Sequence, residues 1–172
     1  MKPRQLEAQL ERLHEESFGW ALSCCGHDRT EAEDVLQTTY LKIITGKARY
    51  QGRSSLKTWV FGVIRRTAQE TSRKAAVERR RRIHLVTDDV EDPNSESPEE
   101  RLERTGATKL LKEAMGALSD RQREVLHLVF YEDLTIAEAA DVMGVSLGSA
   151  RTHYQRGKER LRALLEEGEY VA

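Results

Sequence analysis

The chain has 172 residues, of which 38% are hydrophobic and 33% charged, and its formal net charge is −1. This composition is ordinary for a water-soluble protein of one or two domains, and 6% aromatic residues with three prolines favour helices over a β-sandwich or barrel. No window approaches the roughly 18 apolar residues of a membrane span, and the polar N-terminus does not resemble a signal peptide. We therefore expect a cytoplasmic protein without membrane insertion.

Three helices are predicted in the N-terminal part of the chain. The first spans about 5–24 and the third about 55–75. The second begins at Thr30, because Thr30 and Glu33 have the spacing of a capping box. Its apolar residues are Val35, Leu36, Leu41 and Ile44, and its outer face offers Asp34, Gln37 and Lys42.

A strongly basic segment begins with the loop at 46–55. Residues 46–82 contain twelve Lys or Arg but only two acidic residues, Glu70 and Glu78. Trp59 and Phe61 follow the loop, and aromatic rings beside arginines can hold unstacked bases, with stacking worth about 1–3 kcal/mol per base. The alternative is that both rings belong to the core.

The cysteines and histidines indicate no metal site. Cys24 and Cys25 are adjacent in the chain, which is poor geometry for a disulfide and lacks metal-ligand spacing. The five histidines are scattered. We expect buried, reduced thiols and neither a metal nor a cofactor.

An acidic segment then divides the chain. Residues 83–104 contain eight Asp or Glu, two Arg and two Pro without apolar periodicity, which is typical of a linker. The run Ser97-Pro98-Glu99-Glu100 has the pattern of a helix start. The predicted fold is all-α, with small helical domains at 5–82 and 98–168 joined by a flexible acidic linker at 83–97.

The last third has the pattern of a helix-turn-helix. Thr135 and Glu138 form a capping box, Gly144 suits a left-handed C-cap, and Ser146 can cap the next helix. Between 149 and 162 there are five basic residues and one acidic residue, so positive charge is concentrated on that helix. Such a helix fits a DNA major groove, although a charged amphipathic helix can also be a solvated face.

Four blocks together carry a resemblance to a known family. They are AEDVLQ at 32–37, YQGRSSLKTWV at 50–60, LSDRQREV at 118–125, and the segment 137–161. In order and spacing they resemble a bacterial RNA polymerase sigma factor of the extracytoplasmic-function (ECF) type. The resemblance implies a region 2 domain, a short linker without region 3, and a region 4 domain.

The resemblance also implies partners and contact residues. Core RNA polymerase would be bound through its β′ clamp and β flap, with the clamp contacted by Asp34, Gln37, Tyr40 and Leu41. The promoter −10 element would be opened and read by Tyr50, Arg53, Ser54, Lys57, Trp59, Arg65 and Arg66. The −35 duplex would be read by Arg151, Thr152, Gln155, Arg156 and Lys158. An anti-sigma protein is a further expected partner.

Several positions depart from the family pattern, and two of these departures change the chemistry. His153 stands where a permanent cation is usual, and because histidine is mostly neutral at pH 7 we leave it out of the −35 set. Arg66 stands where an Asn is frequent, so the preferred −10 bases can differ from those of typical members.

Two other functions compete with this interpretation. A stand-alone helix-turn-helix regulator would not need the basic, aromatic block at 47–66. The other is an enzyme, either a nuclease or a thiol enzyme that uses Cys24 or Cys25. The carboxylates Glu31, Glu33 and Asp34 are close in sequence, but Glu33 is explained by capping and no metal-ligand motif accompanies them. We therefore predict a binding protein that performs no chemistry itself.

Overall fold

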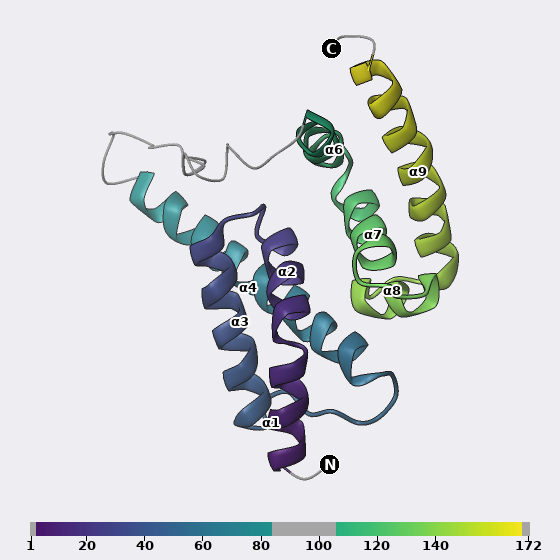
Figure 1. Ribbon diagram of the computed structural model, residues 1–172. Coiled ribbons are helices and arrows are strands. Elements are labelled where there is room, and N and C mark those ends of the chain that lie inside the picture. The colour runs from purple at the N-terminus through teal and green to yellow at the C-terminus, as the bar shows by residue number, and fades with distance from the viewer. Residues whose placement is uncertain (1–2, 84–105, 170–172) are drawn as a thin grey trace. The chain divides into compact units, whose positions relative to one another are not determined.

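The computed structural model describes residues 3–83 and 106–169, which form eight α-helices and no strand (Figure 1). The all-α prediction is confirmed. The chain divides into two compact units, Met1–Pro93 and Asn94–Ala172. The predicted linker begins at Ile83, which is the last residue of α4, and the rest of it and the predicted helix start at Ser97 lie outside the described residues. Of the helices in the described part, none combines the length and apolar character needed to cross a bilayer.

The first unit packs around one long helix. It contains α1 (Pro3–Arg12), α2 (His14–Cys24), α3 (Arg29–Ile44) and α4 (Leu56–Ile83), with α2, α3 and α4 in mutual contact (Figure 1). Trp20, Val35, Phe61 and Ile64 are almost completely buried between them. The Trp20 indole Nε1 donates a 3.1 Å hydrogen bond to the Phe61 carbonyl, which joins α2 to α4.

The helix predicted over 5–24 is two helices. Leu13 separates α1 from α2, with φ −87° and ψ 1° in place of helical angles. The chain changes direction only slightly there, because Leu13 still donates to the Gln9 carbonyl at 3.1 Å and Ser17 to the Leu13 carbonyl at 2.8 Å.

The start predicted for the second helix is also wrong. Asp28 is the N-cap of α3, and its Oδ1 accepts a 2.9 Å hydrogen bond from the Glu31 backbone N–H. The helix therefore begins before Thr30 and places that residue inside the first turn. Glu33 pairs with Arg29 at 3.2 Å and takes no part in capping.

The third helix begins as predicted but ends much later. Ser55 Oγ accepts a 3.1 Å hydrogen bond from the Thr58 N–H at the start of α4, and the helix continues to Ile83. Its final turns contain Ala, Lys and Arg, which are strong helix formers, and cations near a helix C-terminus interact favourably with the helix dipole. Apolar spacing did not reveal these turns because they bury no apolar face.

The second unit contains α6 (Gly106–Gly116), α7 (Asp120–Phe130), α8 (Ile136–Met143) and α9 (Leu147–Glu169). The long helix α9 contacts the other three. It approaches α7 closely at Gly157, where an added Cβ would lie 3.2 Å from Leu126 Cδ1 and 3.3 Å from Gln122 Cβ. Val125, Leu126, Leu128 and Met143 are among the core residues.

The start of α8 and the turn between α8 and α9 both match the sequence prediction. The Thr135 N–H donates to Glu138 Oε2 at 2.8 Å, and the Glu138 N–H donates to Thr135 Oγ1 at 3.2 Å. Gly144 has φ 64° in the left-handed region, where glycine is favoured. Ser146 Oγ accepts from the Ser149 N–H at 3.1 Å. The two helices thus form a helix-turn-helix with both predicted caps.

Candidate nucleic-acid and protein interfaces

One face of α9 is exposed and the opposite face is buried. Ala150 and Gly157 are buried against the other helices of the unit, whereas Arg151, Thr152, Gln155 and Arg156 are exposed. Thr152, Gln155 and Arg156 follow at helical spacing on one side of the first turns. The helix therefore presents two hydrogen-bonding side chains and a guanidinium together.

The polar side chains of this face are held by short-range contacts within α9. Thr152 Oγ1 donates to the Gly148 carbonyl at 3.0 Å, and Gln155 Nε2 donates to Glu159 Oε1 at 2.9 Å. Lys158 is only half-exposed, and its Nζ lies 4.5 Å from the centre of the Tyr154 ring. Of the five residues predicted to read the −35 element, Lys158 is thus set apart from the outer face.

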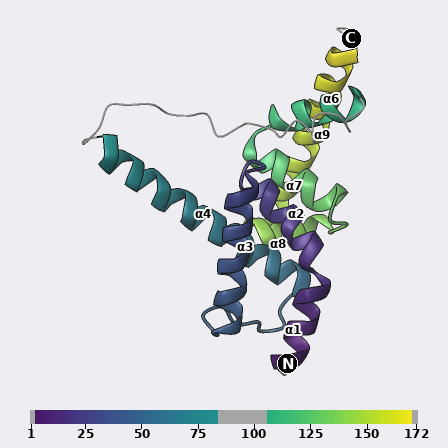
Figure 2. The ribbon, with the colours of Figure 1, turned by 60° about the vertical axis from the view of Figure 1, so that its left-hand side comes forward.

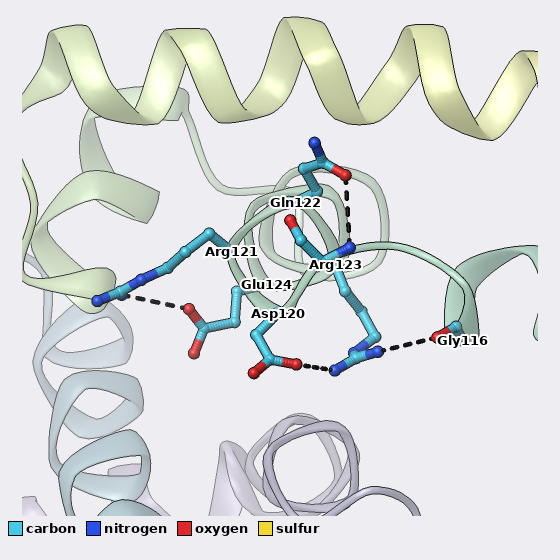
Figure 3. Close-up of polar contacts among 7 residues, drawn as sticks. Gly116, Asp120, Arg121, Gln122, Arg123 and Glu124 are labelled. Carbon is cyan, nitrogen blue, oxygen red and sulfur yellow. Dashed lines mark hydrogen bonds and ion pairs between the residues drawn. The ribbon is translucent and has the colours of Figure 1, made fainter.

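The residues at the start of α7 form polar contacts with one another and with the end of α6. Figure 3 shows Arg123 lying between Asp120 and the carbonyl of Gly116, with 3.4 Å from its Nη1 to that oxygen. Gln122 Oε1 accepts from the Ser119 N–H at 3.4 Å, and Arg121 Nη1 lies 3.4 Å from Glu124 Oε2 (Figure 3). This block of the sequence thus links α6 to α7 through local contacts.

In the first unit, the loop between α3 and α4 borders a groove of about 670 Å³. Loop residues line one side, and residues of α3 and α4 line the other. The lining residues are Lys42, Lys47, Ala48, Arg49, Tyr50, Gln51, Arg53, Ser54, Trp59, Val63, Arg66, Thr67 and Glu70. We call this the loop groove.

Two aromatic rings lie in the wall of the loop groove. The ring centres of Tyr50 and Trp59 are 5.4 Å apart, and the Tyr50 hydroxyl donates a 2.6 Å hydrogen bond to the Ser54 carbonyl. Phe61 is fully buried, but Trp59 is only half-buried. The core interpretation therefore holds for Phe61, while Trp59 borders the groove.

The basic residues predicted to contact the −10 element separate into two groups. Arg53 and Arg66 are exposed and line the loop groove. Arg65 is only 7% exposed. When the Gln69 amide is oriented with its oxygen toward Arg65, that oxygen accepts hydrogen bonds from the two Arg65 Nη atoms at 3.0 and 3.1 Å. Lys57 forms a 2.9 Å ion pair with Glu16 and lies outside the groove lining.

A contact that the sequence did not reveal lies at the edge of the groove. Lys42 was expected on an outer face, but it is half-buried, and its Nζ lies 2.6 Å from Glu70 Oε2 and 3.1 Å from Thr67 Oγ1. The hydrogen bond from Lys42 lowers the pKa of Glu70. The two partners are 28 positions apart in the chain, so no local pattern reveals this pair.

The outer face of α3 combines polar and apolar side chains. Asp34, Gln37, Leu41 and Ile44 recur on this face, and Leu41 and Ile44 are 57% and 60% exposed. The apolar face of the predicted helix had included both of these residues, so the structure corrects that prediction. Exposed branched residues beside polar ones suit a protein-binding surface.

Tyr40 lies beside this face, half-buried. Its hydroxyl is 3.2 Å from His14 Nδ1, and burial raises the pKa of Tyr40. His14 and Tyr40 line two hollows of about 370 Å³ each. Gln37 and Phe18 also line the first hollow, and Leu10 and Ile44 also line the second. The outer face of α3 is therefore hollowed on the side toward α1 and α2.

The two cysteines are free and half-buried at the end of α2. Burial, with smaller contributions from Glu31 and Asp28, raises the pKa of Cys25 to about 12. A thiol with this pKa is protonated at neutral pH and is a poor nucleophile. Within the described residues no group of three His, Cys, Asp or Glu side chains could hold a metal ion.

Comparison with known proteins assigns both units to one family. Residues 10–78 match Sigma-70 region 2, and residues 108–161 match Sigma-70, region 4. The RNA polymerase sigma factor CarQ of Myxococcus xanthus is 29% identical over 136 residues, covering 79% of this chain and 75% of CarQ. The ECF RNA polymerase sigma factor SigX of Bacillus subtilis is 28% identical over 141 residues, covering 81% and 73%.

Solved structures share the fold at lower identity. The sigma factor RpoE of Bartonella quintana, in complex with the anti-sigma factor NepR, matches with a TM-score of 0.74 at 22% identity, covering 95% of this chain and 98% of RpoE. CnrH, in complex with the cytosolic domain of CnrY, matches with a TM-score of 0.65 at 19% identity, covering 96% and 90%.

The chain belongs to the Sigma-70 family, as a sigma factor of the ECF type. It binds core RNA polymerase and directs the polymerase to promoters, as the sequence predicted. The comparisons give no support to the stand-alone regulator.

Proposed function

We propose that three surfaces divide the work of this sigma factor. The outer face of α3 binds the β′ clamp of core polymerase, the loop groove receives bases of the −10 element, and the exposed face of α9 reads the −35 duplex. The observation that carries this proposal is that one chain has both a basic groove with aromatic walls and an exposed reading helix. A regulator that binds only duplex DNA needs the second of these alone.

For the polymerase contact we propose Asp34, Gln37 and Leu41, with Tyr40 supporting them from the side. The exposed Leu41 supplies apolar area, and the polar residues supply directional hydrogen bonds. We add Ile44, because it is 60% exposed on the same face. The β flap is the partner that we propose for the second unit.

For the −10 element we propose that Tyr50 and Trp59 stack on a base that has left the duplex. Ser54, whose carbonyl holds the Tyr50 hydroxyl, shapes the loop, while Arg53 and Arg66 attract the phosphates. We assign the buried Arg65 to supporting α4 from within, and Lys57 to holding α4 against α2 through Glu16.

For the −35 element we propose direct reading by Thr152, Gln155 and Arg156. Arg151 lies toward the edge of this face and suits a phosphate. Lys158, stacked on Tyr154, contributes positive potential from the side. The bonds from Thr152 to Gly148 and from Gln155 to Glu159 are the local contacts that base edges would replace.

We further infer that the chain works in the cytoplasm, performs no chemistry of its own and is held inactive by an anti-sigma protein. Support for that partner comes from two proteins of the same fold, RpoE and CnrH, which were solved with the anti-sigma factor NepR and with a domain of CnrY. For the functional domains we keep the bounds 5–82 and 98–168, with 83–97 as the linker.

Run-off transcription tests the proposal. Core RNA polymerase is mixed with a library of promoter fragments, with and without the protein. Initiation that depends on the protein, and that is lost when Trp59 or Arg156 is replaced by Ala, is the expected result. Initiation that survives both substitutions would show that the groove and the reading helix are assigned wrongly.

A further inference from the structure

The last turns of α4 form a basic helix without a packed face. Every side chain from 72 to 81 is exposed, including Val77 at 51%. This segment contains five Lys or Arg and one acidic residue, Glu78. Figure 2 shows this end of α4 extending away from α1, α2 and α3. Nothing in the first unit requires the helix to be this long, because these turns contribute no residue to its core.

One row of side chains connects this extension to the loop groove. Trp59, Arg66, Arg73 and Arg80 are spaced seven residues apart, which is close to two helical turns, so they lie on one face of α4. Successive members are about 10.5 Å apart along the helix axis. Trp59 and Arg66 line the loop groove. Arg73 and Arg80 therefore continue the same face beyond the groove.

The charge of this row is not cancelled by its neighbours. Glu70 lies between Arg66 and Arg73 on the same side, but it is paired with Lys42 at 2.6 Å. Neither Arg73 nor Arg80 has an ion pair or hydrogen bond with another residue in the described part of the chain. Both guanidinium groups are thus available for a ligand outside the protein.

We propose that Arg73 and Arg80 bind phosphates of duplex DNA between the −10 and −35 elements, as an extension of the loop groove. We call these two residues the arginine track. The inference rests on the proposed role of the groove. DNA is the partner because a straight row of exposed cations complements a polyanion that carries about one charge per 1.7 Å of duplex.

The composition of the extension favours a duplex over other polyanions and surfaces. Binding of single strands uses aromatic side chains on which bases stack, and residues 72–81 include none. A membrane or a protein helix would need an apolar face, and Val77 is the only exposed large apolar residue here. The end of α4 also leads along the chain to the unit that carries α9. We therefore place the bound duplex on the −35 side of the −10 element.

The test compares neighbouring arginines on different faces of α4. Arg80→Gln removes a member of the track, whereas Arg79→Gln removes the same charge from a position about 100° around the helix. The double variant Arg73→Gln/Arg80→Gln removes the whole track. Gln has a helix propensity close to that of Arg, and circular dichroism checks that α4 is kept. Arg73→Lys/Arg80→Lys retains both charges.

The measurement is the affinity of the assembled polymerase for a promoter fragment at several salt concentrations. The slope of log affinity against log salt is negative, and each lost phosphate contact reduces its magnitude by about 0.9. We expect a decrease of about 0.9 for Arg80→Gln, about twice that for the double variant, and none for Arg79→Gln or the Lys variant. Equal slopes for Arg79→Gln and Arg80→Gln would overturn the track.

Two further binding measurements distinguish a failure of this inference from a failure of the proposed function. On a fragment that keeps a single-stranded −10 element but lacks the duplex on its −35 side, the double variant should bind like the wild type. A persisting defect there, or weaker binding to core polymerase without DNA, would assign the arginines to another partner and overturn the proposal. If the wild type itself fails to direct initiation, the proposed function has failed instead.

Discussion

The guanidinium of Arg121, at the start of α7, donates a 3.2 Å hydrogen bond to the carbonyl of Met143, the last residue of α8. The final carbonyls of a helix lack partners within it, so this contact satisfies one of them. It also holds the first helix of the helix-turn-helix against α7. Under the proposed reading of the −35 element by α9, Arg121 acts indirectly, by fixing the position of α8, the helix that precedes α9.

Replacing Arg121 with Ala should lower the free energy of unfolding of the second unit by about 1 kcal/mol, the typical contribution of one such hydrogen bond. Urea unfolding followed by circular dichroism measures the change. Both tryptophans, Trp20 and Trp59, belong to the first unit. Their fluorescence transition should stay in place, and its displacement would contradict a local role. Arg160→Ala, on the exposed side of α9, is the matched control.

Reversing the charge of Asp34 should weaken binding to core polymerase. Asp34→Arg places a cation on the outer face of α3 where an acceptor is exposed, and we expect a loss of about tenfold or more. Affinity is measured without DNA, with a reversal at the exposed Glu15 of α2, Glu15→Arg, as the control. Equal affinity for both variants would move the clamp contact away from α3.

Truncating Arg156 should weaken binding to the −35 duplex. Arg156→Ala should cost about 1–3 kcal/mol on the preferred sequence if the side chain reads a base, with a much smaller effect on unrelated duplexes. If it holds only a phosphate, the loss should be the same on all sequences and the salt dependence should become shallower. Arg162→Ala, farther along α9, controls for the lost charge. Unchanged affinity and unchanged salt dependence would show that the reading face lies elsewhere.

Cys25 should react slowly with alkylating reagents at neutral pH. Its pKa is raised from 9.0 to about 12, so the thiolate fraction at pH 8 is about 1000-fold below that of an unperturbed thiol. Because the thiolate is the reactive form, the rate should keep rising with pH to about 12. Mass spectrometry of the Cys24→Ser variant follows this residue alone, with the urea-unfolded chain as reference. Fast labelling of the folded chain at pH 8 would restore the thiol enzyme as an alternative.

Local features of the helix-turn-helix were predictable because their partners are close in the chain. Thr135 and Glu138 cap each other across three residues, and the left-handed turn at Gly144 needs only a residue without a Cβ. The helical period likewise separates the buried Ala150 from the exposed Arg156. The family followed from the order of several such blocks, which no single helix would have specified.

Faces that depend on distant helices were not predictable in this way. Leu41 and Ile44 have the spacing of core residues, yet no other helix of the unit covers them and both are exposed. Lys42 and Arg65 read as surface cations, but Lys42 is half-buried against Glu70 and Arg65 is almost fully buried. Cap and period thus determined where α4, α8 and α9 begin. Only the packing of α2, α3 and α4 decided which side chains remain accessible, because burial depends on neighbours far away in sequence.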